Sequence, residues 1–545
     1  MRVASVVLRA LLGLFAGFVV LDSARVALRL VADEGVAGAL ADGLSWQLAG
    51  SVLVLVPWCV WLLSRSEDRP PPTVGACLGV GAALVLASFF ALRGRAVWAP
   101  WCIALAAFAP VAFALARRPR LRVAWTLLAA LGWGAASLWG WIGSGYRWYP
   151  IPAAPPTPVE ERGERWRQDL AYAESELLRL HVNALHTVSE DELRASFARL
   201  AARVDELTDL GIGAELAAIV TSIGDAHTGL SGYLDHVPSL PLRMRWMSDG
   251  LVLTHVPSEA PDVARLLGAR VTHLAGVPVE ELFDRVSAVI PHENRSWLLR
   301  QSPDYLLRPA LLHVLGAIDD PGDGPVELRL AGGDAPPSVS FAVGVPSSLS
   351  TAFVKGRFKD RYPERIFWKE RLKRPDVLYV RYRKCLDFLG FRSFAAEILA
   401  ELESDPPERL ILDLRGNTGG SSLQLSWFLL PGLRASAFND PERLFLLIDR
   451  GTFSSGSGNA IEIDDQTEAT LVGEATGGAL NVYGEVRSFR LPGAGWHINY
   501  STRFHPRRPG SGALSLEPEF VRVPSSEDWL ANRDPALQLA LEGLR

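Results

Sequence analysis

The sequence predicts a multi-domain chain with an N-terminal α-helical transmembrane module, a helical subdomain, a small β-rich domain and an α/β core with a largely parallel sheet. Three observations predict it: long apolar runs gather at the N-terminus, short alternating runs follow in the middle, and strand and helix patterns then alternate. At 545 residues the chain is also too long for one domain. The expected parts are a transmembrane module at 1–148, a proline-rich linker at 149–160, the helical subdomain at 161–238, the β-rich domain at 239–346 and the α/β core at 347–545.

The N-terminal part carries five apolar runs, each near the roughly 20 residues that a membrane-spanning helix needs. They lie at residues 4–21, 44–63, 74–92, 97–115 and 123–142. With five spans, the arginines at 65–69 and 117–122 share one side, and the positive-inside rule makes that side cytoplasmic. We therefore expect a multi-pass membrane protein with its C-terminal part outside the cytoplasm; one span fewer would invert that orientation.

The overall charge and the cysteines exclude several classes of function. A net charge of −5 provides no basic field for nucleic acid. Three of the four cysteines lie in the apolar runs, so Cys385 has no disulfide partner in the rest of the chain. No Cys/His cluster has zinc-ligand spacing, and we expect neither a metal nor an organic cofactor. Cys385 itself fits better as a small buried side chain than as a nucleophile.

The middle of the chain has recognisable helix and strand signals. Apolar residues recur with helical spacing after residue 162, and Ser189 with Glu192 predicts a capping box. Between 240 and 345 the alternating runs predict short strands, with a helical insert near 296–315. From Val377 onward the alternation of strands and helices predicts the largely parallel sheet.

Two glycine-rich loops follow strands of this core. In LFLLIDRGTFSSGSG, an apolar strand leads into a turn with Ser454, Ser455 and Ser457, followed by a helix. Such a turn holds a nucleophile beside unpaired backbone N–H groups, although many Gly/Ser turns are only turns. In ILDLRGNTGGSS, Gly419 and Gly420 permit backbone amides to line a pocket. We expect Asp413 and Arg415, which precede them, to brace the loop rather than to react.

A base for a serine nucleophile is sought among ten histidines. His227 stands out because GDAHTGL is a polar loop bounded by glycines at the end of a helical region. A lone histidine is more often structural. Asp225 and Asp449 are possible charge partners, but nearness in sequence is poor evidence of contact.

Taken in order, these motifs resemble the C-terminal processing and tricorn-core family of serine peptidases, also called tail-specific proteases. The order is a helical region, GDAHTGL, the β-rich segment, DLRGNTGG, the serine turn, and VGEATGG. The resemblance covers about residues 169–541. It implies a serine-type endopeptidase that cleaves polypeptides through an acyl-enzyme, and it implies a PDZ-like fold for the β-rich domain.

Carried over residue by residue, the resemblance makes Ser454 the nucleophile and His227 the base. It places the oxyanion donors at Gly419 or Gly420 and at Ser455. In one branch a lysine follows the T-x-G segment, but Ala479 stands there in this chain, so a Ser-His pair is implied. The orienting glutamate of the family is out of register, and Glu517 is the candidate in its place. An unoriented imidazole loses rate, so the alternative is a weak or inactive member that binds peptides or lipids.

Overall fold

The computed structural model describes residues 152–544, except 261, 320, 321, 323, 333, 345–348 and 352–357. Within these ranges, none of the helices is both long and apolar enough to cross a membrane. This finding corrects the predicted fold class and the predicted multi-pass membrane localisation. The predicted transmembrane module at 1–148 lies outside the described residues.

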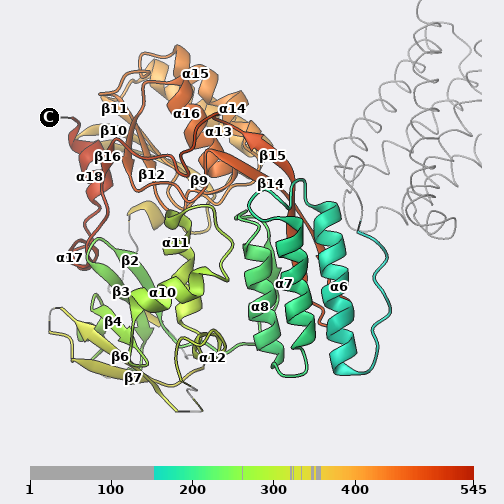
Figure 1. Ribbon diagram of the computed structural model, residues 1–545. Helices are drawn as coiled ribbons and strands as arrows, with labels where there is room; N and C mark the ends of the chain where they lie inside the picture. Colours follow the sequence, from blue (N-terminus) through green and yellow to red (C-terminus); the bar gives the residue numbers. More distant parts are fainter. Residues whose placement is uncertain are drawn as a thin grey trace, which may run out of the picture. The chain divides into compact units, whose positions relative to one another are not determined.

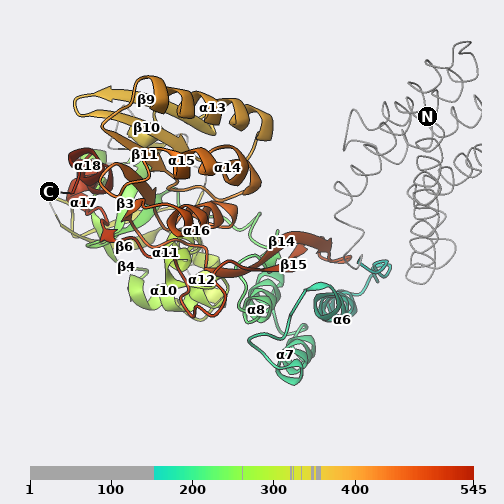
Figure 2. The same cartoon turned by 90° about the horizontal axis from the view of Figure 1, so that it is seen from above.

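Three helices open the described part and pack against a three-stranded antiparallel sheet. The helices are α6 (Arg162–Leu180), α7 (Glu190–Ala202) and α8 (Asp209–Thr221). The strands are β1 (Gly229–Ser231), β14 (Asn481–Arg490) and β15 (His497–Pro506), in the order β1-β15-β14. Leu170 and Leu177 of α6 are buried in one cluster with Ile498 of β15, and the capping box of Ser189 and Glu192 is confirmed. Figure 2 shows β14 and β15 extending from the α/β core toward these helices.

The second part is a seven-stranded antiparallel sheet in the order β2-β3-β4-β6-β7, with β5 beside β4 and β8 beside β3. The strands are β2 (Arg243–Met247), β3 (Gly250–Pro257), β4 (Arg270–Leu274), β5 (Val277–Pro278), β6 (Val326–Ala331), β7 (Ser338–Phe341) and β8 (Leu349–Thr351). Its helices are α9 (Val263–Leu266), α10 (Val279–Ser287), α11 (Arg295–Leu306) and α12 (Pro309–Val314). The last two are the predicted helical insert. The predicted domain boundaries and the PDZ-like assignment stay predictions.

The third part is an α/β core around a six-stranded sheet in the order β16-β13-β12-β11-β10-β9, parallel except for β9 (Figure 1). The strands are β9 (Phe367–Lys373), β10 (Asp376–Tyr382), β11 (Arg409–Asp413), β12 (Leu444–Ile448), β13 (Thr470–Gly473) and β16 (Phe520–Val521). The helices are η2 (Phe358–Asp360), α13 (Phe388–Ser404), α14 (Leu423–Phe428), α15 (Leu430–Ala435), α16 (Ser455–Gln466), α17 (Ser526–Leu530) and α18 (Pro535–Glu542).

The core sheet is covered on both faces, which explains its apolar strands. Leu446 contributes to the cluster on one face, whereas Phe445 and Leu447 contribute to the cluster on the other. All five residues of β12 are buried, as expected for a parallel strand between two layers. Because β11 and β12 are parallel neighbours, both glycine-rich loops leave the sheet at the same edge.

Candidate active site

Ser454 occupies a strained position between β12 and α16. Its φ of 53° and ψ of −126° are unusual for a residue with a side chain. Its hydroxyl makes no hydrogen bond with the described residues, whereas the Ser455 hydroxyl donates to Gly420 O at 2.8 Å and the Ser457 hydroxyl donates to Thr452 O at 2.8 Å. Of the three serines in the turn, Ser454 therefore has the hydroxyl that is free to react.

Glycines make room for this turn. A Cβ on Gly419 would lie 2.8 Å from Ser455 N and 3.0 Å from Ser454 Cβ. A Cβ on Gly478 would lie 3.1 Å from Ser454 N and 2.5 Å from Ser457 Oγ. The segment GEATGG, at the end of β13, thus packs against the serine turn. These two sequence motifs are therefore in contact in the folded chain.

The two loops also supply backbone donors beside Ser454. Gly419 N–H donates to Asn417 Oδ1 at 3.0 Å, so it is already used within its own loop. Gly420 N–H and Ser455 N–H donate to no other described residue, and the hydrogen bond from the Ser455 hydroxyl to Gly420 O joins the two loops. Of the two predicted glycine donors, Gly420 is therefore the one whose N–H is available for an oxyanion.

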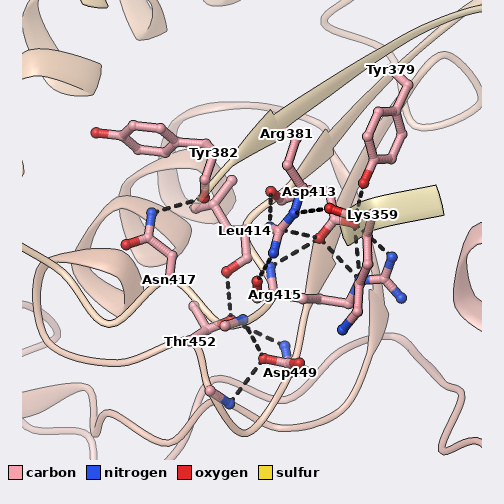
Figure 3. Close-up of polar contacts among 12 residues, drawn as sticks. Lys359, Tyr379, Arg381, Tyr382, Asp413, Leu414, Arg415, Asn417, Asp449 and Thr452 are labelled. Atoms are coloured by element: carbon pink, nitrogen blue, oxygen red, sulfur yellow. Dashed lines mark hydrogen bonds and ion pairs between the residues drawn. The ribbon is translucent and has the colours of Figure 1, made fainter. Parts of the chain in front are cut away.

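Buried charges hold the glycine-rich loop at the edge of the sheet (Figure 3). Arg415 contacts Asp413 at 2.6 Å and Asp534 at 2.8 Å, and Tyr379 donates its hydroxyl to Asp413 at 2.6 Å. Burial works against ionisation of Asp413, but Arg415 and Arg381 hold its pKa well below the ordinary value. The prediction that Asp413 and Arg415 brace the loop is confirmed by these contacts.

Asp449 joins the two loops. Its Oδ1 accepts hydrogen bonds from Gly416 N at 2.7 Å and from Gly451 N at 2.9 Å. Asp449 therefore serves the backbone of the serine turn, and no contact connects it to His227 in the described part of the chain. Cys385 is buried beside Asn417 and Asn459, and burial raises the pKa of its thiol. This environment favours the structural role expected for Cys385.

His227 lies against the residue that precedes Ser454. Its imidazole stacks on Phe453, with ring centroids 4.6 Å apart, and Phe453 stacks on Trp297 at 3.9 Å. Neither ring nitrogen has a hydrogen-bond partner of good geometry among the described residues. Burial lowers the pKa of His227, while the nearby Asp225 carboxylate acts in the opposite direction. The result is a neutral imidazole with free nitrogen atoms next to the serine turn.

Asp225 is the carboxylate that faces His227. Its Oδ1 lies 3.8 Å from His227 Nδ1, and its Oδ2 accepts hydrogen bonds from His181 Nε2 at 3.1 Å and from Thr228 Oγ1 at 2.5 Å. Asn183 N–H donates to His181 Nδ1, which leaves the His181 proton on Nε2. Burial works against ionisation of Asp225, but the hydrogen bond from His181 and the other contacts hold its pKa at about 2.

Glu293 is a site residue that the sequence did not reveal. One donor atom each of Asp225, His227 and Glu293 lies within 4.8 Å of the other two. Both Glu293 carboxyl oxygens are buried without a partner of good geometry among the described residues. Burial, followed by the charge of Asp225, raises the pKa of Glu293 to about 8, so this group is mainly protonated at neutral pH.

The hydrogen bonds of the next residue, Asn294, explain why Glu293 lies in this cluster. Asn294 caps α11 through Trp297 N, and its Nδ2 donates to Gly477 O at 3.0 Å and to Leu514 O at 2.6 Å. These bonds fix the segment before α11 against the segments that follow β13 and β15. In sequence, PHENRSW offers only a helix-cap signal, because the partners lie 183 and 220 residues away.

Asp225, His227 and Glu293 are also a set of donors of the kind that holds a divalent cation. The Asp225 oxygens already accept three protein hydrogen bonds, including one from His227 N at 2.9 Å. This arrangement fits a carboxylate that orders its own loop. Glu517 is exposed on the segment after Leu516 and makes no contact with His227 among the described residues, so its orienting role stays a prediction.

Comparisons with known proteins identify a structural likeness. No family model matches the chain, and no curated protein matches it. The solved structure of mature CPAF is 13% identical, covers 68% of this chain and 94% of that chain, and gives a TM-score of 0.47. The photosystem II D1 C-terminal processing protease is 13% identical, covers 69% and 96%, and gives 0.34. A putative S41 protease from Bacteroides fragilis is 13% identical, covers 59% and 86%, and gives 0.29.

These proteins are what the chain is similar to. Proteases stand among the matching structures. The roles of individual residues in this chain rest on the geometry of the site alone.

Proposed function

We propose that this protein is a serine-type endopeptidase that cleaves polypeptides through an acyl-enzyme. The observation that carries the proposal is Ser454, which keeps a strained backbone and a free hydroxyl next to the neutral, unpartnered imidazole of His227. Strain of this kind costs roughly 1–3 kcal/mol and persists where the surrounding structure enforces it. A turn with only a structural role gains nothing from that cost.

In the proposed reaction, Ser454 Oγ attacks the carbonyl carbon of a peptide bond while His227 takes the hydroxyl proton. Gly420 N–H and Ser455 N–H donate to the oxyanion of the tetrahedral intermediate. His227 then gives the proton to the leaving amine, and water releases the acyl group by the reverse sequence of proton transfers. No hydrogen bond joins Ser454 and His227 in this structure, and such bonds commonly form only with substrate bound.

Asp225 is the acid that we assign to His227. It is ionised, buried and immobilised by His181 and Thr228, so its negative charge is fixed where an imidazolium forms. Glu293 lies in the same cluster as a protonated carboxyl group. A neutral Glu293 leaves the pKa of His227 low in the resting enzyme, which suits a general base.

The test is covalent labelling of the purified full-length chain with a fluorophosphonate, read by intact mass and peptide mapping. We expect one label at Ser454, lost in Ser454→Ala and strongly slowed in His227→Ala. Ser457→Ala is the matched control, because that hydroxyl is buried and bonded to Thr452 O. Labelling that survives Ser454→Ala would refute the mechanism, and a folded chain that takes no label would favour a peptide-binding protein.

A further inference from the structure

A cavity lies beside the loop junction held by Asp449. Its volume is about 530 Å³, and β2, β3, α11 and the loops after β10, β11 and β12 surround it. Gly416 and Gly451 form part of its wall, whereas Ser454 and His227 do not line it. A smaller chamber of about 20 Å³ adjoins it and shares Arg245, Lys359, Arg415 and Asp449.

The wall of this cavity is rich in cations. Its lining includes seven arginines and one lysine: Arg243, Arg245, Arg300, Lys359, Arg381, Arg383, Arg415 and Arg450. Three aspartates line it as well, and three more acids lie behind the wall as partners of the paired arginines. The cations therefore outnumber the acids even when every buried partner is included.

Three of these cations have no hydrogen-bond or ion-pair partner among the described residues. Arg245 and Arg450 contact Glu474, and Arg381 and Arg415 contact Asp413. By contrast, the side chains of Arg243, Arg300 and Lys359 form no hydrogen bond or ion pair with any residue that the structure describes.

Lys359 is the most informative of the three. It stands beside Arg415 in Figure 3. Burial, followed by the charges of Arg415 and Arg245, lowers the pKa of its ammonium group, although Asp449 and Asp360 act in the opposite direction. A buried ammonium group beside several arginines is costly unless anions balance the charge, and the cations of this wall outnumber its acids. The free arginines nearby offer planar donors that match carboxylate and phosphate oxygens.

We propose that this cavity binds a small oxyanion with at least two negative charges, of phosphate or carboxylate type. Its volume lies within the range of small-molecule sites, roughly 300–1,000 Å³. It also lies beyond the carboxyl ends of parallel strands, where open α/β sheets bind their ligands. The anion contacts Lys359 and the free arginines, while Asp449 continues to hold Gly416 and Gly451.

The test is calorimetric titration of the full-length chain with pyrophosphate and with citrate at constant ionic strength. Lys359→Met removes the buried ammonium, and Arg243→Gln and Arg300→Gln each remove one exposed cation. Arg434→Gln is the matched control, since Arg434 is an exposed arginine of α15 that does not line the cavity. We expect binding to the unmodified protein, about tenfold weaker binding for Lys359→Met, severalfold weaker binding for the two glutamine variants, and no change for the control.

Absence of binding by both anions would overturn the proposal, as would equal binding by all variants. Binding of an acidic peptide without binding of either small anion would also overturn it. If Lys359→Met does not fold, as judged by circular dichroism, Arg243→Gln and Arg300→Gln decide the outcome. Ser454→Ala should bind the anion normally, so the result is independent of the proposed peptidase activity.

Discussion

Replacing Ser454 by glycine should stabilise the protein while it abolishes the reaction. The backbone at Ser454 has a φ of 53°, which a residue with a Cβ adopts at a cost of roughly 1–3 kcal/mol. Glycine removes that cost. It also increases the conformational entropy of the unfolded chain, which lowers the free energy of unfolding by roughly 0.5–1 kcal/mol. The net expected gain is about 0.5–2 kcal/mol in the free energy of unfolding.

Ser454→Ala is the matched comparison. Alanine keeps the Cβ and therefore the strain, and the lost hydroxyl makes no hydrogen bond with the described residues. Its free energy of unfolding should therefore stay within roughly 0.5 kcal/mol of the unmodified protein. Both variants should take no fluorophosphonate label, which separates the stability effect from the loss of the nucleophile.

The assay is urea unfolding of the three proteins side by side, followed by tryptophan fluorescence and by circular dichroism. Only differences between variants at the transition that includes the α/β core are compared, because a chain with several domains unfolds in several steps. A Ser454→Gly midpoint equal to or below that of Ser454→Ala would refute the claim that this backbone is strained.

Three further predictions concern the buried cluster. Because the pKa of His227 is lowered, the acidic limb of kcat/KM against pH should have its midpoint below 6.5, the ordinary value for histidine. The pKa of Glu293 is raised from 4.5 to about 8, so the unfolded chain loses this proton first and stability falls as pH rises between those values. Relative to the unmodified protein, Glu293→Gln should therefore gain stability across that window, on the order of 3–5 kcal/mol at pH 8; a pH-independent difference in unfolding midpoints would contradict this. Asp225→Asn should lower the labelling rate at least a hundredfold with the mass and fold unchanged, and normal labelling would remove Asp225 from the mechanism.

Local sequence was enough to predict the α/β core and its two loops. A run such as LFLLI has no polar face, so it fits only a strand covered on both sides. Parallel pairing then brings the loop with Gly420 and the turn with Ser454 to one edge. The alternation of strand and helix patterns therefore predicts this arrangement of the two loops even when no tertiary contact is known.

The role of Glu293, by contrast, could not be predicted from local sequence. Its pKa depends on burial beside Asp225, and that burial is created by the bonds of Asn294 to Gly477 and Leu514. None of these contacts is local, so no sequence signal marks this glutamate of a polar loop as buried. The orienting role of Glu517 depends on non-local contacts in the same way and stays a prediction; the structure shows Glu517 exposed and Asp225 beside His227.

The charges in the cluster around His227 are balanced in a way that the separate sequence motifs do not show. Asp225 and Glu293 are two carboxyl groups in one buried site, and their environments separate their pKa values to about 2 and about 8. Donors from His181 and Thr228 make the first a fixed anion, while burial and the negative charge of Asp225 keep the second protonated. One negative charge beside one neutral imidazole is the balance that a serine nucleophile requires: enough charge to stabilise the imidazolium, and too little to protonate His227 before the reaction starts.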